Sequence, residues 1–107
     1  MRFAKDKLEW LEFDLLKNFS EVTHGVFLRH GGTSEHHFAS LNLSDSVGDH
    51  PDSVKTNREL VQESLGLNTL IFPNQTHGVN VVEVDAKNKS NIHHCDALFT
   101  LILSYIF

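Results

Sequence analysis

An imidazole and an amide side chain stand two residues apart in the stretch 72–78, FPNQTHG, at His77 and Gln75. A histidine held in place by the chain can bind a metal ion through one ring nitrogen or relay a proton. Pro73 restricts the backbone at one end of the stretch and Gly78 frees it at the other, so the chain is expected to turn there. For an isolated segment of this type, a hydrogen-bonded turn histidine is the alternative interpretation.

The elements that must position these side chains are the apolar runs 70–72 (LIF) and 79–84 (VNVVEV), on either side of the stretch. Both runs are rich in β-branched or aromatic residues, which favours strands. Side chains two residues apart project from the same face of an extended chain. We therefore expect Gln75 and His77 to project together at the mouth of a strand.

The stretch 72–78 is accompanied by other short segments, which are 28–34 (LRHGGTS), 39–43 (ASLNL), 47–49 (VGD), 54–58 (VKTNR) and 96–100 (DALFT). Over residues 22–100 this ordered set resembles the YfiH-like family, formerly described as multicopper polyphenol oxidases or laccase-domain proteins. The bacterial members of that family, and a related mammalian protein, are regarded as zinc-dependent purine nucleoside phosphorylases and deaminases. The resemblance implies phosphorolysis of adenosine and inosine, deamination of adenosine, and a purine nucleoside and phosphate as partners.

The resemblance also implies a zinc site, for which this chain carries one matching ligand. In the family, zinc is held by a His from an N-Q-x-H-G segment, a Cys from a later A-D-C segment and a His from a later H-A-G-W-R-G segment. His77 matches the first of these and is the implied catalytic residue. Cys95 does not match the second, because it stands directly before the segment 96–100, and neither later segment occurs in this sequence.

The resemblance is therefore to the N-terminal part of a considerably longer domain, and we expect this chain to be inactive alone. A catalytic zinc needs three protein ligands and an open position. A truncation or frame disruption after Thr100 would explain why the later segments are missing. Oxidation of phenols at copper has less support, because type-1 copper sites use His and Cys ligands in one compact set.

Arg29 and Asn42, together with Gln75, are candidates for substrate contact. Arg29 enters a loop with consecutive glycines, Gly31 and Gly32, whose exposed N–H groups suit an anion, and its guanidinium could clamp a phosphate or a carboxylate. A tight turn with a solvated arginine is the alternative. Asn42 lies between two leucines and is either exposed or lines the pocket. Gln75 would orient the substrate or support the side chains that contact it.

The clearest helix prediction covers Pro51 to Leu65. Asp49 or His50 can cap its N-terminus, Pro51 suits the first turn, and Gly66 suits the residue after the C-terminus. An apolar stripe along the helix defines a buried face, and Asn57 falls within it. Because a buried amide must be hydrogen-bonded, Asn57 is expected to brace a neighbouring loop backbone rather than to act in catalysis.

Two clusters of possible metal ligands are expected to be structural. His36 and His37 are adjacent, so in an extended chain they point to opposite sides, and we expect surface histidines. The run 93–96 (HHCD) contains imidazole, thiol and carboxylate groups, which are all zinc ligands. Neighbouring side chains nevertheless diverge, so Cys95 is expected to pack as a small thiol beside a strand.

The remaining patterns predict an α+β fold, with a mixed or antiparallel sheet and the helix packed against it. Residues 23–29 are a strand candidate. Residues 8–19 fit both a helical face and a strand alternation, and the family resemblance favours the strand, with Trp10 as a partly buried packing residue. A chain of 107 residues is one domain at most, here a single partial domain over residues 1–107.

Composition excludes several classes of function. Hydrophobic content of 40% and charged content of 21% fit a globular domain. The net charge of −5 and the scattering of the 9 basic residues argue against a nucleic-acid partner. One cysteine indicates a reducing compartment, and the charged N-terminus lacks the core of a signal peptide, so the cytoplasm is expected. The uncharged run 97–107 is too short to cross a membrane.

These observations leave three hypotheses about function. The first is an N-terminal fragment of a zinc-dependent purine nucleoside phosphorylase. The second is a small metal- or ligand-binding module that uses His77 with Cys95, His93 or His94. The third is a vestigial fragment that self-associates through its apolar end, residues 101–107, which has the composition of an unpartnered strand.

Overall fold

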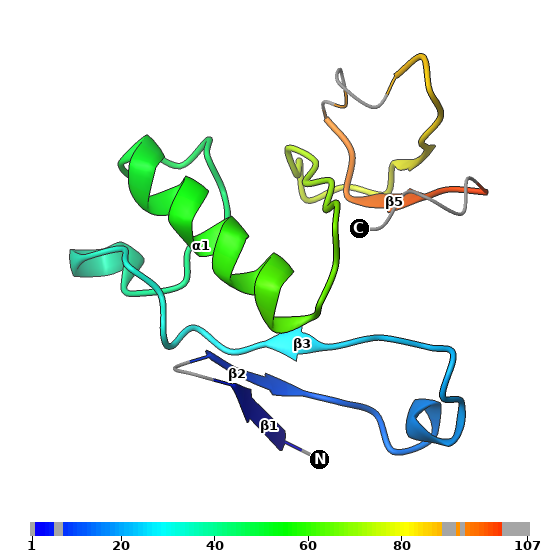
Figure 1. Ribbon diagram of the computed structural model, residues 1–107. Coiled ribbons are helices and arrows are strands. Elements are labelled where there is room, and N and C mark those ends of the chain that lie inside the picture. The colour runs from blue at the N-terminus through cyan, green and yellow to red at the C-terminus, as the bar shows by residue number, and fades with distance from the viewer. Residues whose placement is uncertain (1, 6–7, 89–91, 93, 102–107) are drawn as a thin grey trace. The chain divides into compact units, whose positions relative to one another are not determined.

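The computed structural model of the chain describes residues 2–5, 8–88, 92 and 94–101. The chain divides into two compact units, Met1–Gly66 and Leu67–Phe107 (Figure 1). His93 and the run 102–107, on which two of the functional hypotheses draw, lie outside the described residues.

The first unit is built on a small antiparallel sheet in the order β1-β2-β3. Its strands are β1 (Arg2–Lys5), β2 (Leu8–Leu11) and β3 (Val26–Phe27). Trp10 of β2 lies opposite Phe27 of β3, and their ring centroids are 5.2 Å apart. Leu8 and Trp10 are buried while Leu11 is exposed, so the predicted packing role of Trp10 is confirmed.

Both strand predictions in this unit were too long. Strand β2 ends at Leu11, and the short 3-10 helix η1 (Leu16–Asn18) occupies the end of the run 8–19. Strand β3 covers two residues of the run 23–29. Strand β3 is short because the chain changes its hydrogen-bonding partner after Leu28. The N–H of Leu28 still donates to the carbonyl of Glu9, whereas the carbonyl of Arg29 accepts from the backbone N–H groups of Ser40 and Leu41.

Helix α1 (Pro51–Ser64) confirms the helix prediction and contacts β2. His50 is the N-cap, because its Nδ1 accepts from the backbone N–H of Asp52 at 3.1 Å. Gly66 adopts a φ of +68° just beyond the helix, as expected of a residue that terminates a helix. The buried face carries Val54, Asn57 and Val61. Before the helix, the chain forms the 3-10 helix η2 (His36–Phe38), followed directly by a turn.

The second unit contains a parallel pair, β4 (Val81–Glu83) and β5 (Ala97–Phe99), in which Val82 lies opposite Leu98. Val84 and Cys95, next to these strands, are fully buried. The predicted strand 79–84 is therefore present but shorter, whereas residues 70–72 form neither helix nor strand. One α-helix and an antiparallel sheet in the first unit, with a parallel pair in the second, make an α+β fold, as predicted.

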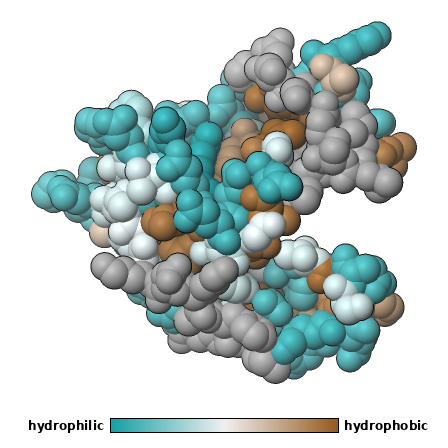
Figure 2. All heavy atoms as spheres, in the orientation of Figure 1, coloured by the Kyte–Doolittle hydropathy of each residue, from teal (hydrophilic) through white to brown (hydrophobic). Residues whose placement is uncertain are grey.

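Large apolar side chains remain exposed in both units. In Figure 2 hydrophobic residues reach the surface in several separate areas, with hydrophilic residues over much of the remainder. The most exposed lie in the second unit, where Val79 is 92% and Leu101 is 78% exposed. Within the described part of the chain, no helix has the length and apolar character needed to cross a membrane.

Candidate functional site

A single carboxylate, that of Asp96, holds the turn that carries His77. Its Oδ1 accepts hydrogen bonds from the backbone N–H groups of Thr76 at 2.8 Å and His77 at 2.6 Å. Its Oδ2 accepts from the backbone N–H of Gly78 at 2.8 Å and from the hydroxyl of Thr76 at 3.0 Å. The turn is therefore organised by a residue that is distant in the sequence.

Backbone hydrogen bonds bring Asp96 to the turn. The N–H groups of Asp96 and Ala97 both donate to the carbonyl of Asn80, at 2.9 and 3.2 Å. The N–H of Cys95 donates to the carbonyl of Asn74 at 3.2 Å. The side-chain amide of Asn80 donates to the carbonyl of His94 at 3.2 Å. The segment before β5 thus lies along the segment that leads from the turn into β4.

The electrostatic environment keeps Asp96 ionised. Desolvation raises the pKa of this carboxyl, but the hydrogen bonds from the backbone of Gly78, from the backbone and hydroxyl of Thr76, and from the backbone of His77 together lower the pKa below its ordinary value. An ionised carboxylate is an acceptor at both oxygens. It can therefore receive all of these donors at once.

His77 projects from an unusual backbone conformation. Its φ is +59°, whereas the neighbouring Gly78 has no positive φ. Positive φ is uncommon for a residue other than glycine, although histidine is among the more tolerant types. The alternation on which the predicted common projection of Gln75 and His77 rested does not apply here, because the chain is not extended at His77. Both side chains are exposed.

The described residues do not fit a zinc ion by themselves. Among them, no group of three or more His, Cys, Asp or Glu side chains is arranged to hold a metal. Cys95 is fully buried, and desolvation, followed by the charge of Asp96, raises the pKa of its thiol, which opposes the thiolate form that binds metal. The prediction that Cys95 packs beside a strand is confirmed.

Arg29 lies in the first unit, and part of its guanidinium is hydrogen-bonded to the backbone. Its Nε and Nη2 donate to the carbonyl of Ala39 at 3.0 and 2.8 Å. It also lines a hollow of about 360 Å³ together with Asn42 and a few neighbours, which are His37, Phe38, Ala39 and Leu41. Asn42 is half-buried and lines this hollow.

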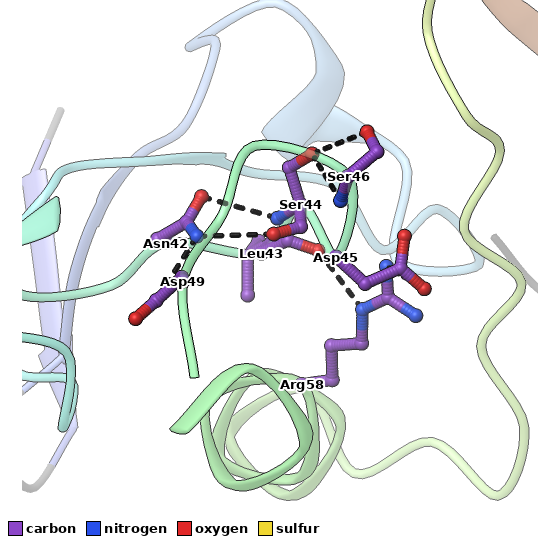
Figure 3. Close-up of polar contacts among 7 residues, drawn as sticks. All are labelled: Asn42, Leu43, Ser44, Asp45, Ser46, Asp49 and Arg58. Carbon is purple, nitrogen blue, oxygen red and sulfur yellow. Dashed lines mark hydrogen bonds and ion pairs between the residues drawn. The ribbon is translucent and has the colours of Figure 1, made fainter. Parts of the chain in front are cut away.

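The polar atoms of Asn42 hold the loop before helix α1 (Figure 3). Its Nδ2 donates to the carbonyl of Ser44 at 3.0 Å and to Oδ2 of Asp49 at 3.1 Å, and its Oδ1 accepts from the N–H of Ser44 at 3.2 Å. Figure 3 also shows Arg58 reaching from α1 to this loop, where its Nε donates to the carbonyl of Leu43 at 2.9 Å. These bonds fix the side of the hollow that Asn42 lines.

Asp49 is a second organising carboxylate. Hydrogen bonds from Ser34 Oγ and then from Asn42 Nδ2 lower the pKa of this carboxyl, against desolvation, and the backbone N–H and the charge of His50 add to the lowering. The Ser34 bond is 2.5 Å long. Ser34 in turn accepts from Nδ2 of Asn57 at 2.9 Å, so a chain of hydrogen bonds runs from the buried face of α1 to Asp49.

The stability of the first unit is expected to fall in acid as Asp49 takes up a proton. Because its folded pKa lies below the ordinary 3.8, the ionised carboxylate stabilises the fold above that value, and the contribution is lost as pH falls through the folded pKa. Relative to Asp49→Asn, the extra free energy of unfolding of the wild type should be constant down to about pH 5 and then shrink at lower pH. Urea titrations across pH measure it.

Glu59→Gln is the control for the change in net charge, because Glu59 is an exposed carboxylate of the same unit. A difference between wild type and Asp49→Asn that stays constant down to about pH 2 would contradict the assignment.

Asn57 confirms its predicted role as a brace. It is fully buried, and its Nδ2 donates to the carbonyls of Ser40 and Asn42 as well as to Ser34 Oγ. Its Oδ1 accepts from the backbone N–H and the hydroxyl of Thr33. One side chain therefore ties the glycine loop and the segment 40–42 to helix α1.

Sequence reasoning missed Asp96 and Asp49 as organising residues. A signal was present for Asp96, since consecutive N–H groups in a turn require an acceptor and an aspartate directly precedes a strand. The predicted site residues fall in separate units: Arg29 and Asn42 line one hollow in the first, and Gln75 and His77 share one turn in the second.

Comparison with known proteins supplies the wider context. The family model described as multi-copper polyphenol oxidoreductase laccase matches residues 23–105. A protein of Bacteroides thetaiotaomicron named purine nucleoside phosphorylase is 33% identical, over 91% of this chain and 39% of its own length. A Haemophilus influenzae protein with the same name is 41% identical, over 67% of this chain and 29% of its own length.

A solved structure shows the same relationship in three dimensions. The crystal structure of the Bacillus licheniformis hypothetical protein YfiH has a TM-score of 0.71 and 25% sequence identity, over 90% of this chain and 38% of that one. The chain therefore spans well under half the length of these relatives.

Proposed function

Because the chain belongs to the multi-copper polyphenol oxidoreductase laccase family, we propose that it supplies the N-terminal part of a purine nucleoside phosphorylase domain and does not turn over nucleosides alone. The observation that carries this proposal is the match to relatives named purine nucleoside phosphorylase, of which the chain spans 39% or less. The substrates would be a purine nucleoside and phosphate. Phosphorolysis of adenosine and inosine is the main reaction, with adenosine deamination as the second.

His77 is the residue of this chain that would lie at the catalytic centre, as a zinc ligand. Its turn is fixed by Asp96, and its imidazole is exposed, so it is available to a ligand. A catalytic zinc, as a Lewis acid, needs three protein ligands. His77 would be one, with the others supplied from outside the described residues. Gln75, two residues before His77, would orient the substrate or support the side chains that contact it.

Arg29 would contribute to binding of an anion. Two of its nitrogens hold the carbonyl of Ala39, which fixes the guanidinium plane at the wall of the hollow that Asn42 also lines. A guanidinium fixed in this way is suited to phosphate. Its remaining N–H groups could donate to a charged acceptor without further loss of side-chain freedom. The lone thiol of Cys95 supports the cytoplasm as the location.

The test is to complete the domain. Residues 1–100 joined to the matching C-terminal segment of the Bacteroides thetaiotaomicron relative should release hypoxanthine from inosine in the presence of phosphate. The activity should be lost in His77→Ala. His36→Ala is the matched control, because His36 is also exposed and also has a positive φ, of 56°. Full activity in the His77 variant would overturn the assignment.

The 107-residue chain alone is expected not to retain zinc at one ion per chain, since His77 is the only family ligand it carries and Cys95 is buried with a raised pKa. Equilibrium dialysis followed by elemental analysis measures the retained metal. Stoichiometric zinc that disappears in His77→Ala would instead support the small metal-binding module, built from His77 with Cys95, His93 or His94.

The exposure of Val79 and Leu101 in the second unit favours a second candidate, self-association of the chain through its apolar end. Sedimentation at several concentrations should then show association that is lost when residues 101–107 are removed. Monodisperse monomers of the intact chain would rule this candidate out.

A further inference from the structure

The turn 76–78 presents three successive backbone N–H groups to one carboxylate, with the Thr76 hydroxyl as a further donor. Successive N–H groups that converge in this way form a concavity suited to an anion. In this chain the anion is part of the polypeptide, the carboxylate of Asp96. The concavity is therefore filled by the chain, and its occupant fixes the backbone around it.

His77 lies at the centre of this arrangement. Its N–H makes the shortest of the contacts, 2.6 Å to Oδ1 of Asp96, and its φ of +59° is a sparsely populated conformation that persists where surrounding contacts hold it. The direction of a Cα–Cβ bond follows from the backbone dihedrals. A contact that fixes the N–H of His77 together with those on either side therefore fixes the direction in which the imidazole leaves the chain.

We propose that Asp96 is the positioning residue of His77, setting the orientation of its imidazole through the backbone of residues 76–78. The inference rests on the proposed function, in which that imidazole serves the reacting centre. Asp96 acts through His77 and does not itself touch substrate.

The chemistry requires a carboxylate at this position. Asparagine is almost the same size, but it offers one acceptor oxygen, and its NH₂ group would face an N–H donor of the turn. Glutamate keeps both acceptor oxygens and the charge on a side chain longer by one methylene group. We therefore expect glutamate to restore part of what asparagine loses.

The test uses the 107-residue chain and nuclear magnetic resonance. In Asp96→Asn, hydrogen exchange of the amides of residues 76–78 should accelerate by about tenfold or more, and the ring signals of His77 should move toward those of an unstructured histidine. Asp96→Glu should give intermediate values for both. A general structural role predicts neither partial recovery in Asp96→Glu nor a change in the His77 ring signals. These two results therefore distinguish positioning of His77 from a general structural role.

Asp85→Asn is the matched control. Asp85 belongs to the same unit, and its Oδ1 accepts from the N–H groups of Lys87 at 2.8 Å and Asn88 at 3.0 Å. Its replacement should accelerate exchange at those two amides and leave the His77 ring signals unchanged. Equal effects of Asp85→Asn and Asp96→Asn on His77, or unchanged exchange in Asp96→Asn, would overturn the proposal.

If Asp96→Asn unfolds β4 and β5, the variant Thr76→Val tests the positioning role of Asp96 instead. This variant removes the hydroxyl bond to Oδ2 and keeps the backbone donors, so exchange at residues 76–78 should rise by about two- to fivefold. His77 ring signals identical to wild type would overturn the proposal.

These measurements need neither nucleoside nor metal, so they stand even if the joined chain is inactive. If the joined chain is active, Asp96→Asn should lower kcat with little change in KM. Retained kcat would overturn the positioning role and leave the proposed function intact.

Discussion

Replacing Asn57 with alanine is expected to destabilise the first unit by about 3 kcal/mol or more. The side chain is 0% exposed and serves donors and acceptors on the loop from Thr33 to Asn42. Removing it takes this partner from the N–H of Thr33 and the carbonyl of Asn42 at part-buried positions, where an unsatisfied polar group is costly, and leaves the carbonyl of Ser40 with the bond from Ser34 N–H. Urea unfolding followed by circular dichroism measures the loss.

Lys55→Ala is the control for this experiment, because Lys55 is exposed on the same helix. Its replacement should change the free energy of unfolding by about 0.5 kcal/mol or less. Asn57→Asp should be at least as damaging as alanine, because it turns a carboxylate oxygen toward carbonyl oxygens in a buried position. A loss of under about 1 kcal/mol in Asn57→Ala would contradict the role of this amide as the brace of the loop.

The brace could be predicted from the sequence because its signals are local. Pro51 and Gly66 mark the ends of the helix, the apolar stripe defines its buried face, and an amide within that stripe must find partners. These signals depend on neighbours within a few residues, so they need no knowledge of the tertiary structure. The same reasoning left the N-cap open between Asp49 and His50, and the structure assigns it to His50.

The His77 turn could be located but not described from the sequence. Its geometry depends on Asp96, which lies 19 residues further on, and on hydrogen bonds between the segments around Asn80 and Asp96. A spacing rule for extended chain predicts alternating side chains, and it fails where the backbone enters the left-handed region, as it does at His77. The turn itself indicates that an acceptor is needed, but the sequence around the turn does not identify Asp96 as that acceptor.

The predicted strands were too long, and the strand predicted at 70–72 was wrong, for a related reason. β-branched and aromatic residues favour strands only where a partner strand lies beside them. Residues 70–72 have the composition of a strand and belong to none, and the run 23–29 pairs with β2 over a short length before Arg29 turns to the segment 40–41. Which segments pair as strands is determined by the whole fold, and a local sequence pattern does not predict it.

Replacing Gly32 with alanine is expected to destabilise the first unit by about 2–3 kcal/mol. A Cβ at this position would lie 2.7 Å from Oδ1 of Asn57 and 2.7 Å from Cα of Leu41, and it would overlap the carbonyl oxygen of Ser40. Two of these atoms belong to the backbone, and Asn57 is held by its own hydrogen bonds, so none can withdraw easily. The loop passes this close to α1 because residue 32 has no side chain.

Gly48→Ala is the matched control, since it separates lack of space from backbone strain. Gly48 has a φ of +96°, and no atom lies within 4 Å of the position that a Cβ would take there, so alanine should cost about 1 kcal/mol through its backbone alone. Gly32 has no positive φ, so its cost arises from crowding. Equal losses in the two variants would mean that the loop can move away from α1, and would contradict the close approach on which the Asn57 brace depends.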